Sequence, residues 1–379
     1  MFWIGIFWLC AAFLAYTFVG YPLLLALVAQ RRKVSHRRAP LQPTVTVIIP
    51  AHNEAARIAR KIENTLALDY PEDRREIFVV SDGSNDETLA VARQYESRGV
   101  RCLELKERKG KHHAQWLALQ ASHGEIVVFT DCSADLDRDA LSKIVANFAD
   151  PTVGCVSSED EVLSDKVPWA GERIYVQLEM ALRRLEARAG SLVGVSGSFF
   201  AARREICDAW HTTMSSDFFL PLHAAEKGLR TVVDLECRGR YGVVRSERDE
   251  LTRKVRTIVH GLDVLFLHAH LLNPFRYGFF AVQLASHKLF RWLVPFAALG
   301  LLGSSIALHD AGAIYRLALL AQAVVHGGGL LSLLLNPGSV LKLLRPAGFF
   351  LLGSAATVMA WMYYLSGERF VIWQPSRRT

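Results

Sequence analysis

The chain of 379 residues is 51% hydrophobic and 21% charged, with 44 Lys and Arg against 37 Asp and Glu. This composition excludes a disordered or collagen-like chain, and the length suffices for two or three units with a buried core. The six cysteines form no CxxC pair or other metal-ligand spacing, so we expect reduced thiols in a reducing compartment. No basic stripe interleaved with aromatic residues accompanies the net charge of +7, and we therefore expect no nucleic-acid partner.

Residues 1–30 predict a transmembrane anchor. No charged residue occurs between Phe2 and Gln30, and this stretch is longer than the roughly 20 residues that a helix needs to cross a bilayer. A signal peptide is the alternative, but its basic start, shorter apolar stretch and small-residue cleavage site are missing. Residues 31–43 begin with Arg31-Arg32-Lys33 and predict a basic juxtamembrane linker on the cytoplasmic side.

Residues 44–245 predict a domain in which strands and helices alternate. A β-branched run extends from residue 44 to 49, and apolar residues at helical spacing follow from 53 to 68. The same strand-helix unit recurs at 76–81 with 86–97, at 101–105 with 111–122, and at 125–130 with 139–148. This alternation predicts an α/β fold with a mostly parallel sheet covered on both faces. Ligands bind such sheets beyond the carboxyl ends of the strands.

Polar residues follow three of these predicted strands, at 51–54, 82–86 and 131–135. Carboxylates at neighbouring strand ends repel one another unless a cation or a hydrogen-bonding ligand lies between them, so Asp82 and Asp131 together predict a binding site. A helix N-cap is the alternative for any single carboxylate, and Asp86 fits that alternative. The first turn contains neither GxGxxG nor GxxxxGK[ST], which disfavours a Rossmann dehydrogenase and a P-loop NTPase.

Residues 246–290 predict amphipathic helices that lie in the membrane interface. This part of the chain is apolar but ionisable side chains recur along it: His260, His268, His270, His287, Lys288 and, just beyond it, Arg291. Apolar and charged residues together in one helix are typical of an interfacial helix. A core helix of the central domain is the alternative.

Residues 291–366 predict three further transmembrane helices, at about 292–308, 317–335 and 346–366. The loop between the second and third carries Lys342 and Arg345, which places it on the cytoplasmic side. Parity then sends the basic tail, residues 367–379, to the opposite side. Three arginines of that tail favour the cytoplasmic side instead: Arg369, Arg377 and Arg378.

Five segments, taken in order, resemble the membrane-embedded glycosyltransferases of family 2, which are the relatives of hyaluronan, chitin and cellulose synthases. The segments are Val47–Glu54, Val80–Thr88, Gly110–Lys111, Phe129–Ser133 and Ser216–Leu220. The similarity covers about residues 44–290 and extends to the membrane layout. It implies a GT-A fold with one N-terminal and about three C-terminal transmembrane helices, and an inverting transfer of a sugar from a nucleotide-sugar.

The resemblance also implies roles around the donor. Asp82 matches the aspartate that contacts the nucleotide base, and the turn beside base and ribose consists of Pro50, His52, Asn53 and Glu54. Asp131 and Ser133 match the two ends of the Asp-x-Asp element that holds a divalent metal, Mg²⁺ or Mn²⁺, on the diphosphate. Here a serine replaces the second aspartate.

Three basic residues are assigned to the phosphates by the same resemblance. Lys111 matches the lysine of the family's Gly-Lys pair, and a lysine at a helix start is well placed to meet phosphate; a solvated charge is the alternative. Residues 252–257 take the place of the Gln-x-x-Arg-Trp motif of processive synthases. Arg253 and Arg256 lie in this segment, which lacks the glutamine and the tryptophan.

Asp217 matches the family's general base, which takes the proton from the attacking acceptor hydroxyl. Capping of the helix that it opens is the alternative. Ser196, Gly197 and Ser198 resemble the acceptor-side segment, where small residues let a sugar approach the backbone.

These roles predict transfer from a UDP-sugar to a lipid-linked or growing saccharide, in a multi-pass protein of the inner or plasma membrane with a cytoplasmic catalytic domain. Polysaccharide-export proteins are possible partners. Two alternatives remain open. One is a processive synthase with its own translocation path, and the other is a catalytically weak GT-A scaffold in a polysaccharide assembly complex.

Overall fold

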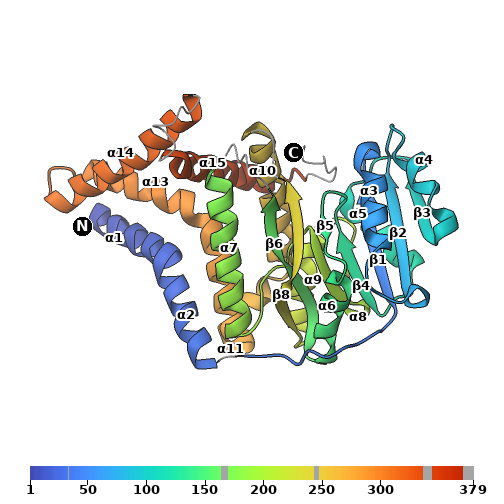
Figure 1. The fold of residues 1–379 in the computed structure, drawn as a ribbon. Helices are drawn as coiled ribbons and strands as arrows, with labels where there is room; N and C mark the ends of the chain where they lie inside the picture. The colour runs from blue at the N-terminus through green and yellow to red at the C-terminus, as the bar shows by residue number, and fades with distance from the viewer. Residues whose placement is uncertain (33, 164–169, 243–246, 336–343, 370–379) are drawn as a thin grey trace.

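A mixed β-sheet occupies one side of the molecule, and long helices lie on the other side (Figure 1). The computed structural model describes the chain except for residues 33, 164–169, 243–246, 336–343 and 370–379. Lys33, Lys342, Arg377 and Arg378 of the predicted basic segments therefore lie outside the described residues. In the part of the chain that the structure describes, eight strands follow the order β3-β2-β1-β4-β7-β6-β8-β5.

Four parallel strands make up one half of the sheet: β1 (Val45–Ala51), β2 (Arg75–Asp82), β3 (Val100–Leu105) and β4 (Ile126–Thr130). Their register places Val47 opposite both Ile77 and Val128. Helices α3 (Ala55–Leu66), α4 (Thr88–Arg93), α5 (Lys111–Ala121) and α6 (Ala140–Ala146) follow them in turn. The predicted strand-helix units are thus confirmed.

The two faces of the sheet are covered by different helices because side chains alternate along a strand. Val47 and Ile49 of β1 pack with α3, α4 and α6 in one buried apolar cluster. Ile48 packs into a second cluster with α5, α9 (Ser216–Glu226) and α10 (Glu247–Leu267). Helix α5, which follows β3, thus covers the opposite face of the sheet from α3, α4 and α6. We call the region beyond the carboxyl ends of the parallel strands, where ligands bind in such sheets, the crevice.

The other half of the sheet changes direction. Strand β7 (Phe199–Arg203) runs antiparallel to β4, and β6 (Val153–Leu163) runs antiparallel to β7. Strand β8 (Arg230–Gly242) is parallel to β6, and the short β5 (Asp135–Leu136) pairs with its edge. The segment 191–198 enters β7 directly beside the end of β4, and this brings it to the crevice.

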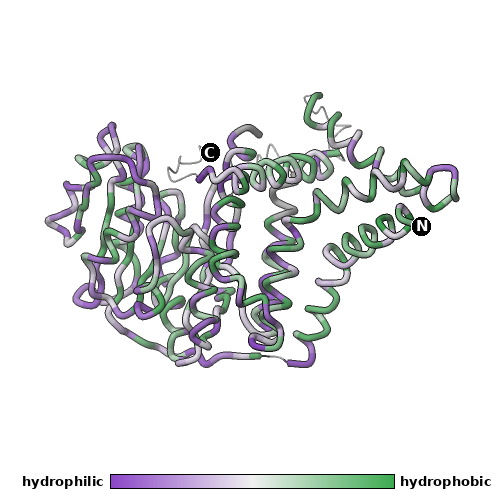
Figure 2. The backbone as a smooth tube through the Cα atoms, turned by 180° about the vertical axis from the view of Figure 1, so that it is seen from behind, coloured by the Kyte–Doolittle hydropathy of each residue, from purple (hydrophilic) through white to green (hydrophobic). Residues whose placement is uncertain are grey.

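Within the described ranges, four helices are long and apolar enough to cross a membrane: Phe2–Arg32, Phe279–Ala307, Ala313–Leu334 and Arg345–Leu365. The protein buries only 11–22% of the most apolar stretch of each, so most of their apolar side chains would face water without a bilayer. Figure 2 shows this hydrophobic group of helices beside the more polar sheet domain. One such helix precedes the domain and three follow it, as predicted, and they associate the chain with a membrane.

The first C-terminal span begins at Phe279, earlier than the predicted start near residue 292. It consists of α12 (Phe279–Leu284), a π-helical turn and α13 (Arg291–Ala307). The sequence pattern broke at His287 and Arg291, but both side chains contact Glu179 of α7 (Ala170–Ala189), at 3.0 and 2.8 Å. Because these charges meet a protein partner, they do not end the helix.

The last span, α15 (Arg345–Leu365), packs along α10 of the domain. Val255 and Val259 of α10 meet Ala356 and Ala360 of α15 in a small apolar cluster. Beyond the end of α15, Arg369 Nε lies 2.6 Å from Asp263 Oδ1 of α10. The beginning of the basic tail is therefore held against the domain.

Candidate active site

The loop after β2 is fixed by the carboxylate of Asp82, which is only 1% exposed. Its two oxygens accept hydrogen bonds from the backbone amides of Lys109 (2.7 Å) and Gly110 (2.8 Å), just before α5. His52 Nδ1 donates to the Asp82 carbonyl oxygen at 2.6 Å. Asp82 thus joins the loops after β1, β2 and β3, and its contact with a nucleotide base stays a prediction.

Gly83 makes the close approach of these loops possible. Its φ is +59°, and a Cβ placed there would lie 2.6 Å from the backbone nitrogen of Arg108. Any other residue would meet both the backbone strain of the left-handed region and this clash.

The turn after β1 contacts the turn after β2. Among the described residues, Asn53 is the only one other than glycine with positive φ (53°), and its Oδ1 accepts a hydrogen bond from the Asn85 amide at 3.0 Å. Asp86 accepts from the first amides of α3 and α4, those of Ala55 and Thr88, so the capping alternative holds for Asp86.

Pro50 lies near the end of β1 as a buried residue, and beyond it Glu54 is buried as well, with 6% exposure. Burial raises the pKa of the Glu54 carboxyl, although the Arg57 guanidinium opposes this effect. Glu54 and Asp131 act on each other electrostatically across the crevice, as two neighbouring carboxylates do.

Four predicted residues from distant parts of the chain meet at the end of β4. Lys111 Nζ, in the first turn of α5, lies 2.6 Å from Asp131 Oδ1 and donates to the Gly197 carbonyl oxygen at 3.0 Å. A Cβ built on Gly197 would lie 2.9 Å from Asp217 Oδ2, which belongs to the first turn of α9. Lys111, the predicted phosphate ligand, therefore links the predicted metal ligand Asp131 to the acceptor segment at Gly197, and Gly197 lies next to the predicted base.

Positive charge gathers beside this group. Burial lowers the pKa of the Arg256 guanidinium to about 10, and the charges of Arg253 and Arg108 act in the same direction. Burial also lowers the pKa of His112 well below its usual value, with further contributions from His260, Lys111 and Arg256. Neighbouring cations of this kind favour the binding of an anion between them.

Arg253 has an internal partner as well. Its Nε and Nη2 donate to the two carboxylate oxygens of Glu250, one helical turn earlier, each at 2.8 Å. Binding of a phosphate by Arg253 therefore stays a prediction and would compete with this bidentate pair.

The acceptor segment has a partner that the sequence pattern did not predict. Ser196 and Ser198 both donate to Asp160 Oδ1 of β6, Ser198 at 3.0 Å, and the two hydroxyl oxygens are 2.7 Å apart. Arg183 of α7 lies 3.8 Å from the other carboxylate oxygen of Asp160. The acidic run of residues 159–161 inside a strand was the only sign of this site in the sequence.

A second residue that was missed is Lys61 of α3, which is 1% exposed. Its Nζ donates to Thr130 Oγ1 at 2.9 Å and to the Ala134 carbonyl oxygen at 2.7 Å. These two hydrogen bonds of the amine hold both ends of the loop that carries Asp131 and Ser133. Burial lowers the pKa of the Lys61 amine to about 8. A single lysine in a helical pattern is typical of a surface residue, so no local signal indicated this role.

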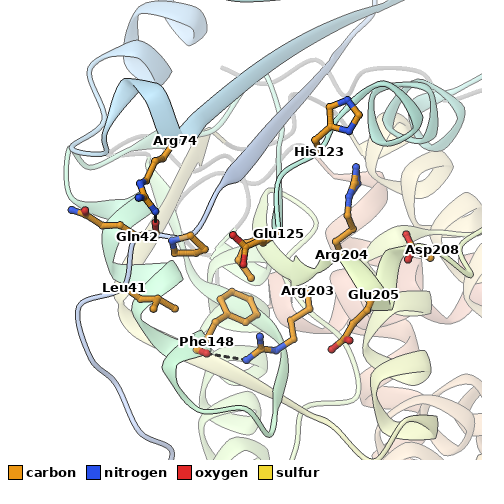
Figure 3. A pocket seen from close by; sticks show the side chains of 12 residues that line it. Leu41, Gln42, Arg74, His123, Glu125, Phe148, Arg203, Arg204, Glu205 and Asp208 are labelled. Carbon is orange, nitrogen blue, oxygen red and sulfur yellow. Dashed lines mark hydrogen bonds between the residues drawn. The ribbon is translucent and has the colours of Figure 1, made fainter.

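A pocket lies at the opposite end of the parallel strands, near the beginnings of β1 and β4 (Figure 3). Two arginines of this pocket bind backbone carbonyl groups. Arg203 donates to the carbonyl oxygens of Val153 and Phe148, and Arg204 donates to that of Leu119. The pocket contains none of the predicted site residues. It is therefore distinct from the crevice at the carboxyl ends of the strands.

The chain is similar to known proteins over the domain that contains this candidate site. Residues 46–211 match the family model described as glycosyl transferase family 2. Among solved structures, the chain is similar to a mannosyltransferase from Pyrobaculum calidifontis, in complex with GDP-Man and Mn²⁺. That similarity has a TM-score of 0.73 and 27% identity, and it covers 96% of this chain and 100% of the other.

Curated proteins match over shorter stretches. A beta-monoglucosyldiacylglycerol synthase from Synechocystis sp. is 28% identical over 173 residues, which are 44% of this chain and 36% of that protein. An N-acetylglucosaminyltransferase from Rhizobium meliloti is 31% identical over 169 residues, which are 43% of this chain and 39% of that protein. The chain thus spans well under two thirds of the length of these curated relatives. The family model itself ends before Asp217 and Arg256.

Proposed function

We propose that this chain, which contains a family 2 glycosyltransferase domain with a GT-A fold, is an active transferase. It transfers a sugar from a nucleotide-sugar to a lipid-linked or growing saccharide. The transfer inverts the configuration at the sugar carbon and takes place at a cell membrane, with the domain on the cytoplasmic side. One observation carries the proposal. Lys111 contacts both Asp131 and Gly197, and Gly197 lies next to Asp217.

The donor's diphosphate would occupy the space beside Lys111 and Arg256, whose charges offset the negative charge that grows on the leaving nucleotide. Asp131 and Ser133 would hold a divalent cation there. Mg²⁺ and Mn²⁺ sites of this kind need only one or two carboxylates together with substrate phosphates, so one aspartate and one hydroxyl fit. When bound, the cation supplies further positive charge to the diphosphate.

Asp217 would act as the general base. Its carboxylate belongs to the first turn of α9, near the positive end of the helix dipole. The carboxylate takes the proton of the acceptor hydroxyl while that oxygen attacks the sugar carbon from the side opposite the nucleotide. Attack from that side inverts the configuration. Gly197, which has no side chain, lets the Asp217 carboxylate approach the backbone of the acceptor segment.

Contacts between α9 and the membrane-side helices support a lipid-linked acceptor. Lys288 Nζ lies 5.2 Å from the ring centre of Phe218, the residue after Asp217. The same ring meets Trp292, with 6.2 Å between ring centres. Lys288 and Trp292 belong to the helix Phe279–Ala307, so the predicted base lies close to a helix that is apolar and long enough to enter the bilayer. A hydroxyl carried on a membrane-anchored molecule could reach Asp217 from there.

The nucleotide and the product length complete the proposal. We expect a UDP-sugar as donor, and GDP-sugars are included in its test because the Pyrobaculum calidifontis structure contains GDP-Man. We favour the transfer of one or a few sugars over processive synthesis, since residues 252–257 lack the glutamine and tryptophan of the processive motif. Partners in polysaccharide export stay a prediction.

The test is turnover of UDP- and GDP-sugars by the detergent-purified chain, with membrane lipid extract as acceptor and with Mg²⁺, Mn²⁺ or a chelator. We expect metal-dependent release of the nucleoside diphosphate. Asp217→Asn should lower the rate by about 10²- to 10⁴-fold while donor binding, measured by titration calorimetry, is kept. Asp208→Asn, an exposed aspartate outside the crevice, is the matched control.

Two outcomes would contradict the proposal. Full activity of Asp217→Asn would remove Asp217 as the base. No release with any donor would leave the scaffold alternative, in which the domain binds other proteins without turnover. A polymer of many sugars on each acceptor, by contrast, would favour the processive alternative over single transfer.

A further inference from the structure

Three histidines and one glutamate gather at the C-terminal end of α9. His223 and Glu226 are three residues apart on this helix and therefore share a face. His268 and His270 come from the turn after α10. Glu226 follows Asp217 by nine residues, or roughly 14 Å along the helix, so this cluster is separate from the crevice.

Glu226 is the centre of the cluster. Its Oε2 lies 2.8 Å from His223 Nδ1 and 3.6 Å from His268 Nε2, and its Oε1 lies 2.6 Å from His270 Nε2. The ligand atoms of His223, Glu226 and His268 all lie within 4.8 Å of one another. In a tetrahedral zinc site with bonds of about 2.0–2.1 Å, neighbouring ligand atoms are about 3.3 Å apart, so small side-chain movements suffice.

The hydrogen bond of His268 sets which of its nitrogens faces Glu226. His268 Nδ1 lies 3.0 Å from the carbonyl oxygen of Val264, and because a carbonyl only accepts, this nitrogen carries a proton. In the neutral ring, Nε2 then has a lone pair directed at a carboxylate oxygen. Two acceptors that face each other are brought together by a proton or by a metal cation between them. A histidine that donates its other ring N–H to a backbone carbonyl is the usual state of a metal ligand.

The surroundings also suit a bound ion. The ring of Phe219 lies against His223 and His268, with ring centres 5.9 and 5.0 Å away, and forms an apolar wall on one side. His268 is 3% exposed, while the side chain of His270 is 43% exposed and leaves a path for entry.

We propose that His223, Glu226 and His268 bind a transition-metal ion of the zinc class, with His270 holding the second oxygen of Glu226 or completing the coordination. Two imidazoles and one carboxylate are a ligand set that Zn²⁺ takes in proteins, and a fourth position is then open to water or to His270. The ion would join the end of α9, the helix that begins with Ser216 and Asp217, to the turn that leads into the span Phe279–Ala307.

The test counts zinc on the full-length chain in detergent. The protein is stripped with a chelator, dialysed against ZnCl₂ with a weak competing chelator, and analysed by elemental mass spectrometry. We expect one zinc per chain for the wild type and for Asp131→Asn, so this result does not depend on the transferase proposal. His223→Gln and Glu226→Gln should lose it, and His270→Ala should bind about 10-fold more weakly.

A stability measurement keeps the test valid if a variant folds poorly. ZnCl₂ should raise the thermal midpoint of the stripped wild type and leave that of Glu226→Gln unchanged. His211→Ala, an exposed histidine outside the cluster, is the matched control and should bind zinc as the wild type does. Failure of the wild type to bind zinc, or equal zinc in wild type, His223→Gln and Glu226→Gln, would show that the cluster is only a hydrogen-bonded network around Glu226.

Discussion

Gly197 lies between the predicted base and the predicted phosphate ligand, since its carbonyl accepts from Lys111 and its α-carbon faces Asp217. A methyl group there would press on Asp217 Oδ2, the mobile end of a side chain, and not on backbone. The fold can therefore absorb Gly197→Ala, but the carboxylate must move.

We accordingly predict that Gly197→Ala lowers kcat by up to about 100-fold with little change in the thermal midpoint, because misplacing a catalytic group by about 1 Å costs this much. Steady-state turnover together with thermal denaturation checks it. Gly303→Ala is the control, since a Cβ built on Gly303 would meet nothing within 4 Å. Wild-type kcat in Gly197→Ala would mean that the position of the Asp217 carboxylate does not limit the rate.

Lys61 makes the free energy of unfolding depend on pH. Burial lowers its pKa from 10.5 to about 8 in the folded chain, so between these values the unfolded chain binds more protons. Stability therefore rises with pH across the window from 8 to 10.5, by as much as about 3 kcal/mol. As pH falls through this window the gain is lost, and below pH 8 the lysine is protonated in both states.

The measurement is the thermal midpoint as a function of pH for wild type and Lys61→Met. The difference between the two proteins should change across pH 8 to 10.5 and stay constant below pH 8. Lys227→Met, which removes an exposed lysine, controls for the general effect of alkaline pH. Parallel curves for wild type and Lys61→Met would contradict the prediction.

At the scale of elements, α7 connects the domain to the membrane helices through buried charges. Glu186 is fully buried, and its Oε1 accepts from Tyr21 Oη and from His287 Nδ1, each at 2.7 Å. Glu179 lies about two turns earlier on the same helix and meets His287 and Arg291. Burial raises the pKa of Glu179, but the charges of His287 and Arg291 outweigh burial and hold the pKa well below its usual value.

Tyr21→Phe should therefore destabilise the chain by about 2 kcal/mol, because a buried carboxylate loses a hydrogen bond. Tyr16→Phe is the matched comparison, since the Tyr16 hydroxyl bonds the neutral Ser286 at 2.8 Å and its loss should cost about 1 kcal/mol. Chemical denaturation in detergent measures both. A double-mutant cycle with Glu186→Gln should show coupling for Tyr21 alone; equal costs and no coupling would refute the argument.

The strands and helices of the parallel half could be predicted because their pattern is local. The spacing of the apolar residues, together with the polar residues at the strand ends, located β1, β2 and β4 and the residues that follow them. The same reasoning missed Asp160 and Lys61, since each acquires its partners only through long-range packing. It also began the first C-terminal span too late, because the partners of its charged residues are on α7, far away in sequence.

The order of strands after β4 was beyond prediction for a related reason. Strand β7 enters between β4 and β6 and reverses direction, and no turn residue in the sequence specifies that neighbour. The contact of Gly197 with Lys111 and Asp217 depends on this strand order. The resemblance to the family therefore identified these residues, but only the folded structure shows that they lie close together.

At the scale of the whole molecule, the four apolar helices differ in how they relate to the domain. The loop between α13 and α14 (Ala313–Leu334) lies at the far end of the helical layer from the sheet (Figure 1). Helix α15, in contrast, runs beside α10, and Lys254 of α10 already meets Phe349 near its start. Both ends of α15 are thus near the domain, which conflicts with a simple fourth crossing of the bilayer.

This arrangement predicts that the segment after α15 lies on the same side of the membrane as the catalytic domain. The arginines of that segment favour this side, whereas the number of predicted crossings favours the other. In sealed vesicles, a cysteine at exposed Glu368 should react with an impermeant maleimide on the same side as one at His211 of the domain. A cysteine at Asp310, in the loop after α13, should react only from the other side. Cys10→Ser and Cys102→Ser remove the partly exposed native thiols. If the cysteine at residue 368 were labelled together with that at 310, α15 would cross the bilayer, and the ion pair of Arg369 with Asp263 could not form in the membrane.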